Sequence, residues 1–267
     1  MVKRLNYVLF GISLWLFCFN HATLPAQSWQ LEDSTAISLP KSIVNSTHNW
    51  FYIATAEGSI IQYTRQGDTL RTYQPTHQEP PILLPWQTLR LQAYFPFQQI
   101  LTVLDQNLNE VSNILLPEAT TGNATLSADQ QVWYISTNLI LNKYNPQLAE
   151  NTLSTSLQWY LSAENQVHLL QEYQNRLYIQ TDKALLIFDL FGNFLSKRLL
   201  STNFPIQFLA DESYFLSGES IHFIHLYSAA TRRLTVPAGK NILKILIEKE
   251  YLHGYSERFW YTYSIID

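Results

Sequence analysis

The amino-acid sequence predicts an all-β protein, a β-propeller of about six four-stranded blades whose last blade is completed by an N-terminal strand. Three observations lead to this prediction. A unit of about forty residues recurs, its segments read as strands with almost no helix signals, and the final unit lacks one strand that the start of the chain can supply. A fixed period of this kind is the signature of a repeat fold in which each repeat is one supersecondary unit.

The repeat is clearest in two segments, 50–70 and 176–195, in which 52–70 aligns with 177–195 without a gap at a constant offset of 125 residues. Each contains an apolar strand, a short turn, a second apolar strand ending in an aromatic residue, a tight turn and a more polar third strand. Gly67 falls on Gly192 in this alignment. Both turns are therefore expected to need the positive φ that glycine adopts readily.

The end of the second apolar strand marks each copy of the unit. The six markers are Tyr63, Leu104, Tyr144, Phe188, Leu226 and Tyr263. They are separated by 41, 40, 44, 38 and 37 residues, a period that is too long for a leucine-rich repeat and close to a propeller blade. The second and fifth copies are degenerate, so five or seven blades remain open beside six.

Closure of the ring is an independent test of the repeat. The last copy supplies strands at 242–247, 251–255 and 258–265, and then the chain ends without an outer strand. The segment Ser28–Glu32 lies ahead of the first complete unit and has strand composition. We expect this segment to become the missing strand.

One turn carries a resemblance to a known family. The run Leu185–Leu195 places an Asp, two residues and a Gly between two apolar strands, and in this it resembles NHL-type and related six-bladed propellers. The resemblance is confined to the blade pattern and implies the fold but little about function. The Gly-His and Trp-Asp pairs of WD40 blades and the Trp-ending pattern of quinone-cofactor propellers are missing. Asp105 and Asp189 occupy the turn position, where we expect them to cap backbone N–H groups.

The N-terminus predicts export. Lys3 and Arg4 precede an uncharged apolar stretch at 7–19, which is typical of a signal peptide and short for a membrane span. We expect a signal peptide at 1–26 and one propeller domain at 27–267, with cleavage after Gln27 and an uncleaved anchor as alternatives. Cleavage removes Cys18, the only cysteine. A cysteine-free exported chain fits a bacterial periplasm, cell envelope or exterior better than an animal secretory pathway, with no membrane span after cleavage.

Composition excludes nucleic acid as a partner. Charged residues make up 14% of the 267-residue chain, the formal net charge is −4 and the isoelectric point is near 6.0. Binding to phosphates requires clustered Lys and Arg, which this sequence lacks.

No motif for catalysis, metals or cofactors is evident. A Gly-x-Ser-x-Gly elbow and a phosphate-binding glycine loop are absent. His222 and His225 are three apart on an expected strand and therefore point to opposite faces, while His48 lies in an expected loop and His253 on a strand near a turn. Asp211 and Glu212 are adjacent and are expected in a turn. We therefore predict no catalytic residues, no metal and no cofactor.

The leading hypothesis is a non-catalytic binding or scaffold module for a protein, peptide or glycan. It is based on the absence of catalytic motifs in a rigid fold that presents loops to solvent, and it is an argument from analogy with other propellers. The alternative is a hydrolase or lyase whose channel-mouth metal or acid–base site is assembled from residues scattered in sequence. A third reading makes the chain part of a larger secreted assembly, and the oligomeric state stays open.

Several aromatic and polar residues fall on expected turns and strand ends, where propellers bind ligands. Trp86 and Trp260 are among these aromatic residues, and the Pro-rich loop at 74–81 is expected at a blade junction on the same mouth. Packing between blades is the alternative role for the aromatic rings. The candidate binding residues at the channel mouth or its loops are His77, Phe95, Phe97, Asp182 and Tyr255.

Overall fold

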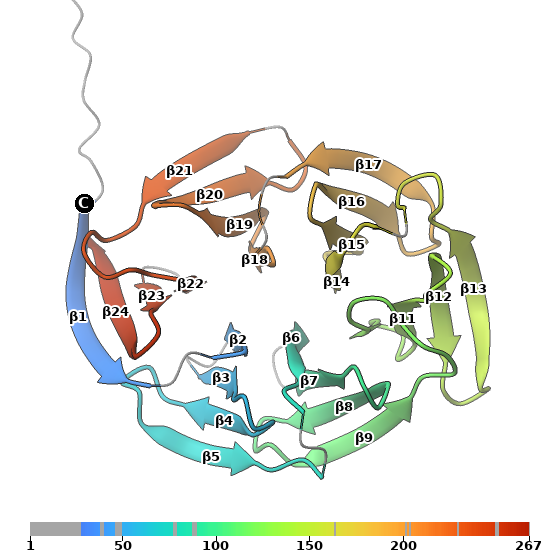
Figure 1. Ribbon diagram of the computed structural model, residues 1–267, viewed down its shortest axis with the longest axis horizontal. Coiled ribbons are helices and arrows are strands. Elements are labelled where there is room, and N and C mark those ends of the chain that lie inside the picture. Colours follow the sequence, from blue (N-terminus) through green and yellow to red (C-terminus); the bar gives the residue numbers. More distant parts are fainter. Residues whose placement is uncertain are drawn as a thin grey trace, which may run out of the picture.

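The computed structural model shows a ring of six four-stranded antiparallel sheets (Figure 1). The predicted propeller is confirmed, and the blade number is six. Within the described ranges there is no helix, and hence none long and apolar enough to cross a membrane. The structure describes residues 28–37, 40–45, 50–76, 79–86, 90–162, 164–200, 202, 204–228, 230–248 and 251–266. The expected signal peptide and its cleavage site lie outside these residues.

Each blade is a meander whose first strand lies nearest the centre of the ring. Blades 1 and 2 contain β2 (Ser42–Asn45), β3 (Phe51–Ala54), β4 (Ile60–Tyr63), β5 (Thr69–Tyr73), β6 (Ile82–Trp86), β7 (Arg90–Phe95), β8 (Ile100–Asp105) and β9 (Glu110–Leu115). Blades 3 and 4 contain β10 (Thr125–Leu126), β11 (Val132–Ile135), β12 (Ile140–Asn145), β13 (Glu150–Ser156), β14 (Val167–Tyr173), β15 (Arg176–Thr181), β16 (Ala184–Asp189) and β17 (Phe194–Leu199).

The last two blades differ in how they are assembled. Blade 5 contains β18 (Gln207–Leu209), β19 (Glu212–Ser217), β20 (Ser220–His225) and β21 (Thr231–Thr235). Blade 6 contains β22 (Lys244–Glu248), β23 (Tyr251–Tyr255), β24 (Phe259–Ile266) and, as its outer strand, β1 (Ser28–Ala36). β1 pairs with β24 from Ser28 opposite Ile266 to Ala36 opposite Phe259. The predicted closure is confirmed, although the closing strand is longer than expected.

The antiparallel meander gives the ring two distinct faces. All six innermost strands run in the same direction, so they begin on one face, here called face 1, and end on the other, face 2. Face 1 carries the connections between blades and the turns between second and third strands. Face 2 carries the turns between first and second strands and those between third and fourth strands. Loops distant in sequence are thereby gathered on one surface.

The burial of the strands explains the repeat seen in the sequence. The second strands are buried on both sides, as in β3 and β11, because each blade packs between two others. They consequently read as continuous apolar runs rather than as alternating ones. The outermost strands, such as β5, are largely exposed. The pattern of two apolar strands followed by a polar strand reflects this distance from the ring centre.

The sequence markers coincide with a recurrent β-bulge. The pairing between third and fourth strands shifts at Tyr63, Leu104, Tyr144 and Phe188, where one residue of the fourth strand is skipped. Blade 6 has the same shift where β1 pairs with β24. A bulge increases the local twist of the pair. A large apolar residue at the bulge therefore marks the point where each blade twists toward the tight turn on face 2.

The turn chemistry predicted for Asp105 and Asp189 is confirmed. Asp189 Oδ1 accepts hydrogen bonds from the N–H groups of Phe191 (2.9 Å) and Asn193 (2.8 Å), and Asp105 Oδ1 does the same for Asn107 and Asn109, both at 2.8 Å. Gly67 and Gly192 have φ values of 86° and 76°. A Cβ at Gly192 would lie 2.7 Å from Thr155 Oγ1, so this turn also packs closely on the blade beside it.

Hydrogen bonds between blades, which we call interblade clasps, join the inner strands around the ring. At five junctions a side chain of one blade accepts a backbone N–H of the next. These pairs are Leu83 N to Ser42 Oγ (2.9 Å), Leu126 N to Gln92 Oε1 (2.8 Å), Leu170 N to Asn123 Oδ1 (2.7 Å), Ile206 N to Gln180 Oε1 (2.7 Å) and Ile247 N to Tyr214 Oη (2.9 Å). At the sixth junction, Lys244 Nζ donates to the carbonyl oxygens of Pro40 (2.6 Å) and Lys41 (2.9 Å). The clasps satisfy polar groups on the free edges of the innermost strands.

His253 is a fully buried histidine in the closing blade. Its Nδ1 accepts a hydrogen bond from Trp260 Nε1 at 3.1 Å, and an indole N–H can only donate, so the proton of the neutral ring lies on Nε2. Phe51 packs on the ring at 4.4 Å between centroids. Burial, with a smaller contribution from the charge of Arg65, lowers the pKa of His253 to about 3.

The free energy of unfolding should consequently decrease as the pH is lowered, already at pH values above those at which carboxylates titrate. His253 is neutral in the folded state above pH 3, whereas in the unfolded chain it takes up a proton below its ordinary pKa of about 6.5. Between these values the unfolded state binds more protons, so acid favours unfolding, by about 2 kcal/mol at pH 5 for this one group. Denaturant unfolding between pH 8 and pH 5 measures the effect.

The matched variant for this measurement is His253→Asn, because Oδ1 of Asn can still accept from Trp260 and does not titrate. The loss of stability between pH 8 and pH 5 should shrink by about 2 kcal/mol in the variant. The pKa of His222 is also lowered, first by burial and then by Arg233, and this group contributes equally to both proteins. An unchanged pH dependence in His253→Asn would mean that His253 is protonated in the folded protein.

Candidate functional site: the central channel

A cavity of about 740 Å³ lies at the centre of the ring and is lined by residues of all six blades. This volume is within the range of sites that bind small molecules or peptide segments. The propeller geometry explains its position, since the innermost strands surround the axis of the ring (Figure 1). The cavity therefore belongs to the ring as a whole and to no single repeat.

The wall of the cavity is mainly apolar. Its aliphatic and aromatic lining residues include Val44, Leu84, Leu169, Ile206, Phe208 and Leu246. All lie on innermost strands or directly beside them. The clasps already bind backbone N–H groups of several of these strands. The wall therefore offers a ligand apolar surface and few free hydrogen-bonding groups.

Two lysines lie where the cavity meets face 1. Lys244 begins β22, and Lys41 directly precedes β2 in the adjoining blade. In the described part of the chain the Lys244 ammonium has two carbonyl oxygens as hydrogen-bond acceptors and no carboxylate. Burial, and secondarily the positive charge of Lys41, lowers the pKa of Lys244 to about 8. Among the described residues neither lysine forms an ion pair, although the pKa of Glu57, in the turn between β3 and β4, is lowered first by a backbone hydrogen bond and to a smaller extent by the charge of Lys41.

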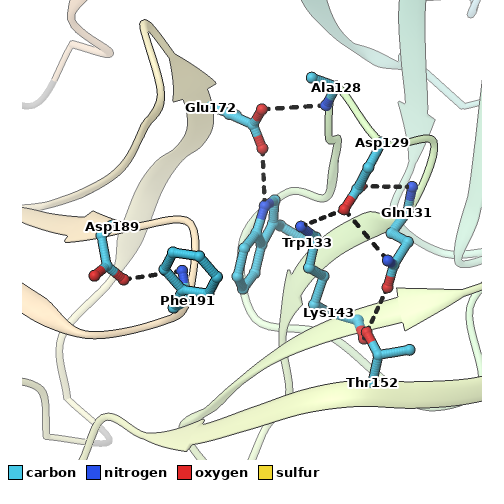
Figure 2. A network of polar contacts seen from close by, with 9 residues as sticks. All are labelled: Ala128, Asp129, Gln131, Trp133, Lys143, Thr152, Glu172, Asp189 and Phe191. Carbon is cyan, nitrogen blue, oxygen red and sulfur yellow. Dashed lines mark hydrogen bonds and ion pairs between the residues drawn. The ribbon is translucent and has the colours of Figure 1, made fainter.

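The carboxylates near face 2 are already engaged. Glu172, near the end of β14, accepts hydrogen bonds from Trp133 Nε1 (3.0 Å) and from the N–H of Ala128 (3.1 Å), as Figure 2 shows. Glu248, the last residue of β22, forms an ion pair with Arg65 at 3.3 Å. Each of these bonds ties an inner strand to another blade, so both glutamates have structural partners.

The loop between β10 and β11 is held by the same network (Figure 2). Asp129 forms an ion pair with Lys143 at 2.6 Å and accepts a hydrogen bond from the N–H of Gln131 at 3.2 Å. Burial alone would raise the pKa of Asp129, but these bonds outweigh burial and the net pKa is lowered. The Lys143 ammonium also lies 5.0 Å from the centroid of the Trp133 ring, a favourable cation–π distance.

The candidate binding residues that the structure describes all lie at the face 1 end of their blades, but only some are accessible. Phe97 is 88% exposed in the turn between β7 and β8, and its N–H donates to Glu79. Asp182 is half-buried between β15 and β16 and accepts a hydrogen bond from Asn165 Nδ2 at 3.3 Å. Phe95 and Tyr255 are fully buried and pack in the cores between blades.

The other candidates from the sequence are placed as follows. His77, His48 and the side chain of Trp86 lie outside the described residues. Trp260 is buried beside His253. The described parts of the 74–81 loop connect β5 with β6 on face 1, which is the expected blade junction.

The remaining polar candidates have structural partners. His222 stacks on Phe215, with 5.2 Å between ring centroids, and His225 Nδ1 accepts the N–H of Tyr227 at 3.1 Å. Glu212 pairs with Arg232, whereas Asp211 lies in the preceding turn and accepts from Gln174. In the ranges that the structure describes, no three His, Cys, Asp or Glu residues are grouped as a metal ion would require.

Sequence reasoning missed three residues on face 1. Trp159, in the connection between blades 3 and 4, is 91% exposed, and Phe204 lines the cavity from the next connection. The third is Lys244, whose signal was present, since it is a lone charge within the β-like run Ile242–Ile247. We refer below to Phe97, Trp159 and Phe204 as the rim aromatics.

Comparison with known proteins shows the fold alone. No family model and no curated protein matches the chain. Similar solved structures include BamB from Moraxella catarrhalis (10% identity, TM-score 0.52, covering 89% of this chain and 98% of that one). A catalytically inactive virginiamycin B lyase from Staphylococcus aureus with quinupristin and the Cps50 (Swd1) β-propeller domain of Myceliophteria thermophila are each 10% identical, with a TM-score of 0.63 and coverage of 90% and 100%. One fold thus serves a lyase and other proteins, and function has to be argued from the site.

Proposed function

We propose that the chain is an exported, non-catalytic binding module that holds a protein or peptide partner on face 1. The observation that carries this proposal is the exposure of the rim aromatics. Phe97 and Trp159 project from connections anchored in rigid blades, and Phe204 lies at the cavity. Large aromatic side chains on a rigid support are the typical anchors of protein interfaces.

The neighbouring surface favours a protein over a glycan. Leu115 and Leu199, at the face 1 ends of β9 and β17, are also well exposed. Sugars stack on aromatic rings, whereas a surface that combines aromatic and aliphatic side chains suits the apolar centre of a protein interface. The engaged carboxylates Glu172 and Glu248 favour binding over acid–base catalysis.

Site-specific photo-crosslinking in the native host tests the binding face. A photoreactive residue at position 97 or 159 should yield the same discrete adduct, whereas one at position 191 should not. Phe191 is the matched control, since it is a phenylalanine turn residue with 78% exposure but lies on face 2. With the identified partner purified, Trp159→Ala should weaken binding about tenfold or more, as Trp anchors commonly do, and Phe191→Ala should leave it unchanged. Adducts from position 191 alone would contradict the proposed face.

Two further measurements test export and the absence of catalysis. Export predicts that the envelope or secreted protein begins at Gln27 or Ser28 by N-terminal sequencing. Elemental mass spectrometry of this mature protein tests the hydrolase or lyase alternative. A stoichiometric Ca²⁺, Zn²⁺ or iron would contradict the non-catalytic function and favour the alternative.

A further inference from the structure

The central cavity has properties that the proposed interface does not use. Its wall is mainly apolar, and the interblade clasps cover part of the backbone of β6, β10, β14 and β22. At β2 and β18 the clasps bind residues just before the strand. An extended peptide needs partners for its own N–H and C=O groups when it leaves water. A hydrocarbon chain needs none. The wall therefore matches a chain of methylene groups better than a peptide backbone.

The dimensions of the channel match an elongated ligand. The innermost strands range from two residues in β10 to seven in β14, and the longest of them corresponds to about 20 Å at the usual rise per residue. The cavity volume of about 740 Å³ is within the range of ligand sites. A long acyl chain is narrow and extended, so it can lie along the axis between the inner strands.

The two ends of the channel carry different charged groups, and this difference favours a head group at face 1. At face 1 the ammonium of Lys244 finds only carbonyl acceptors in the described part of the chain, and Lys41 adds a second positive charge. His168, near the face 1 end of β14, lines the same cavity, and its buried Nε2 has no hydrogen-bond partner among the described residues. At face 2 the lining carries Arg90 and two glutamates, and the glutamates are bonded to Arg65 and Trp133. Within the described residues, an ammonium without a carboxylate partner and an imidazole nitrogen without a hydrogen-bond partner therefore lie at the face 1 end.

We propose that the central cavity binds a long-chain carboxylate, with its hydrocarbon chain along the channel axis and its carboxylate at Lys244 and Lys41. The ammonium of Lys244 has three N–H donors, and two of them are used on Pro40 and Lys41. The third donates to the ligand carboxylate. A charge-assisted hydrogen bond in a partly buried site is stronger than a neutral one, so the lysines set both the affinity and the direction of the ligand.

Fluorescence titration of the full mature protein with cis-parinarate, followed by displacement with palmitate, tests the site. Palmitate should displace the probe at one site per chain. Hexadecanol has the same chain without the charge and should bind about tenfold or more weakly, because a hydrogen bond to a charged group is lost. This comparison uses the unsubstituted protein, so its outcome does not depend on whether a variant folds. Equal affinity for the alcohol, or no saturable binding of the probe, would overturn the proposal.

Three single substitutions locate the head group. Lys41→Met and Lys244→Met should each weaken palmitate about tenfold and leave hexadecanol unchanged. Lys240→Met is the matched control: Lys240 lies four residues before Lys244 in the connection between β21 and β22, outside the cavity lining and over the Tyr261 ring, and its loss should change neither affinity. Lys244→Met also removes an interblade clasp and could prevent folding. In that case Lys41→Met, which leaves the clasp intact, still tests the head-group site. An equal loss in all three variants would indicate attraction by net charge alone and contradict the assignment.

Discussion

A chain that begins at Ile37 should not form the closed ring, whereas a chain that begins at Gln27 should. β1 is the nine-residue outer strand of blade 6, and every residue that pairs with it lies on β24, at the opposite end of the sequence. Trp29 adds a contact to blade 5, where its Nε1 donates to the Thr235 carbonyl at 2.6 Å. Without β1, the β24 edge is exposed for its whole length, and an open edge strand is a template for aggregation.

The loss should be comparable to the whole stability of a typical domain, about 5–15 kcal/mol, because the strand joins the two ends of the ring. Thr35 also contributes to closure of the ring, since its Oγ1 donates a hydrogen bond to the Gln66 carbonyl of blade 1 at 3.4 Å. Size-exclusion chromatography and denaturant unfolding of both chains measure the effect. We expect aggregation or the absence of a cooperative transition for the shorter chain, and partial rescue by a synthetic peptide of residues 27–37. A monomeric short chain with the same unfolding midpoint would show that the ring does not need this closure.

The second large effect concerns the clasp at Asn123. This side chain is buried, donates through Nδ2 to the Leu170 carbonyl at 2.9 Å and accepts the Leu170 N–H at 2.7 Å. Asn123→Ala removes both bonds and leaves a donor and an acceptor of blade 4 buried without partners. Each unsatisfied group costs about 1–3 kcal/mol, so the free energy of unfolding should drop by roughly 2–6 kcal/mol.

Two comparisons make this measurement specific. Asn107→Ala, at an exposed Asn on a face 2 turn, should change the free energy of unfolding by less than about 0.5 kcal/mol. Asn123→Asp keeps the acceptor oxygen but loses the donor, and it adds a buried charge that must be neutralised. It should therefore also be destabilised, and less so at acidic pH, where the carboxyl is protonated and can donate again. A wild-type free energy of unfolding in Asn123→Ala would mean that water replaces the clasp.

The architecture could be predicted because its signals are local and repeated. Each blade has two apolar strands followed by a polar one, and the tight turn repeats the Asp or Gly that its geometry demands. In blades 1 to 4 the marker lies within one residue of the end of the third strand, and in blade 5 the marker Leu226 directly follows β20. In every blade except blade 5 the marker also lies at the β-bulge. The strand missing from the last copy was equally visible in the sequence. A closed ring needs a complete outer strand in every blade, and the last copy supplies only three strands.

The site could be predicted only in part, because accessibility is not a local property. Phe95 and Phe97 are two residues apart, yet one is fully buried and the other almost fully exposed. The difference arises because Phe95 ends a strand covered by blade 1 residues, whereas Phe97 lies in the turn beyond it. Tyr255, another candidate, is likewise covered by Phe51 and other residues packed between blades 6 and 1.

The all-β class, the blade period, the closing strand and the turn chemistry follow from the amino-acid sequence, because each depends on residues within one blade or on the spacing of the repeats. Which side chains reach the channel, and which groups they contact there, depends on the assembled ring. Lys244 meets Pro40 and Lys41 across the closure of the ring, and Asn123 meets Leu170 across a blade junction. Such contacts join residues that the backbone brings together only when all six blades are in place, so no local pattern records them.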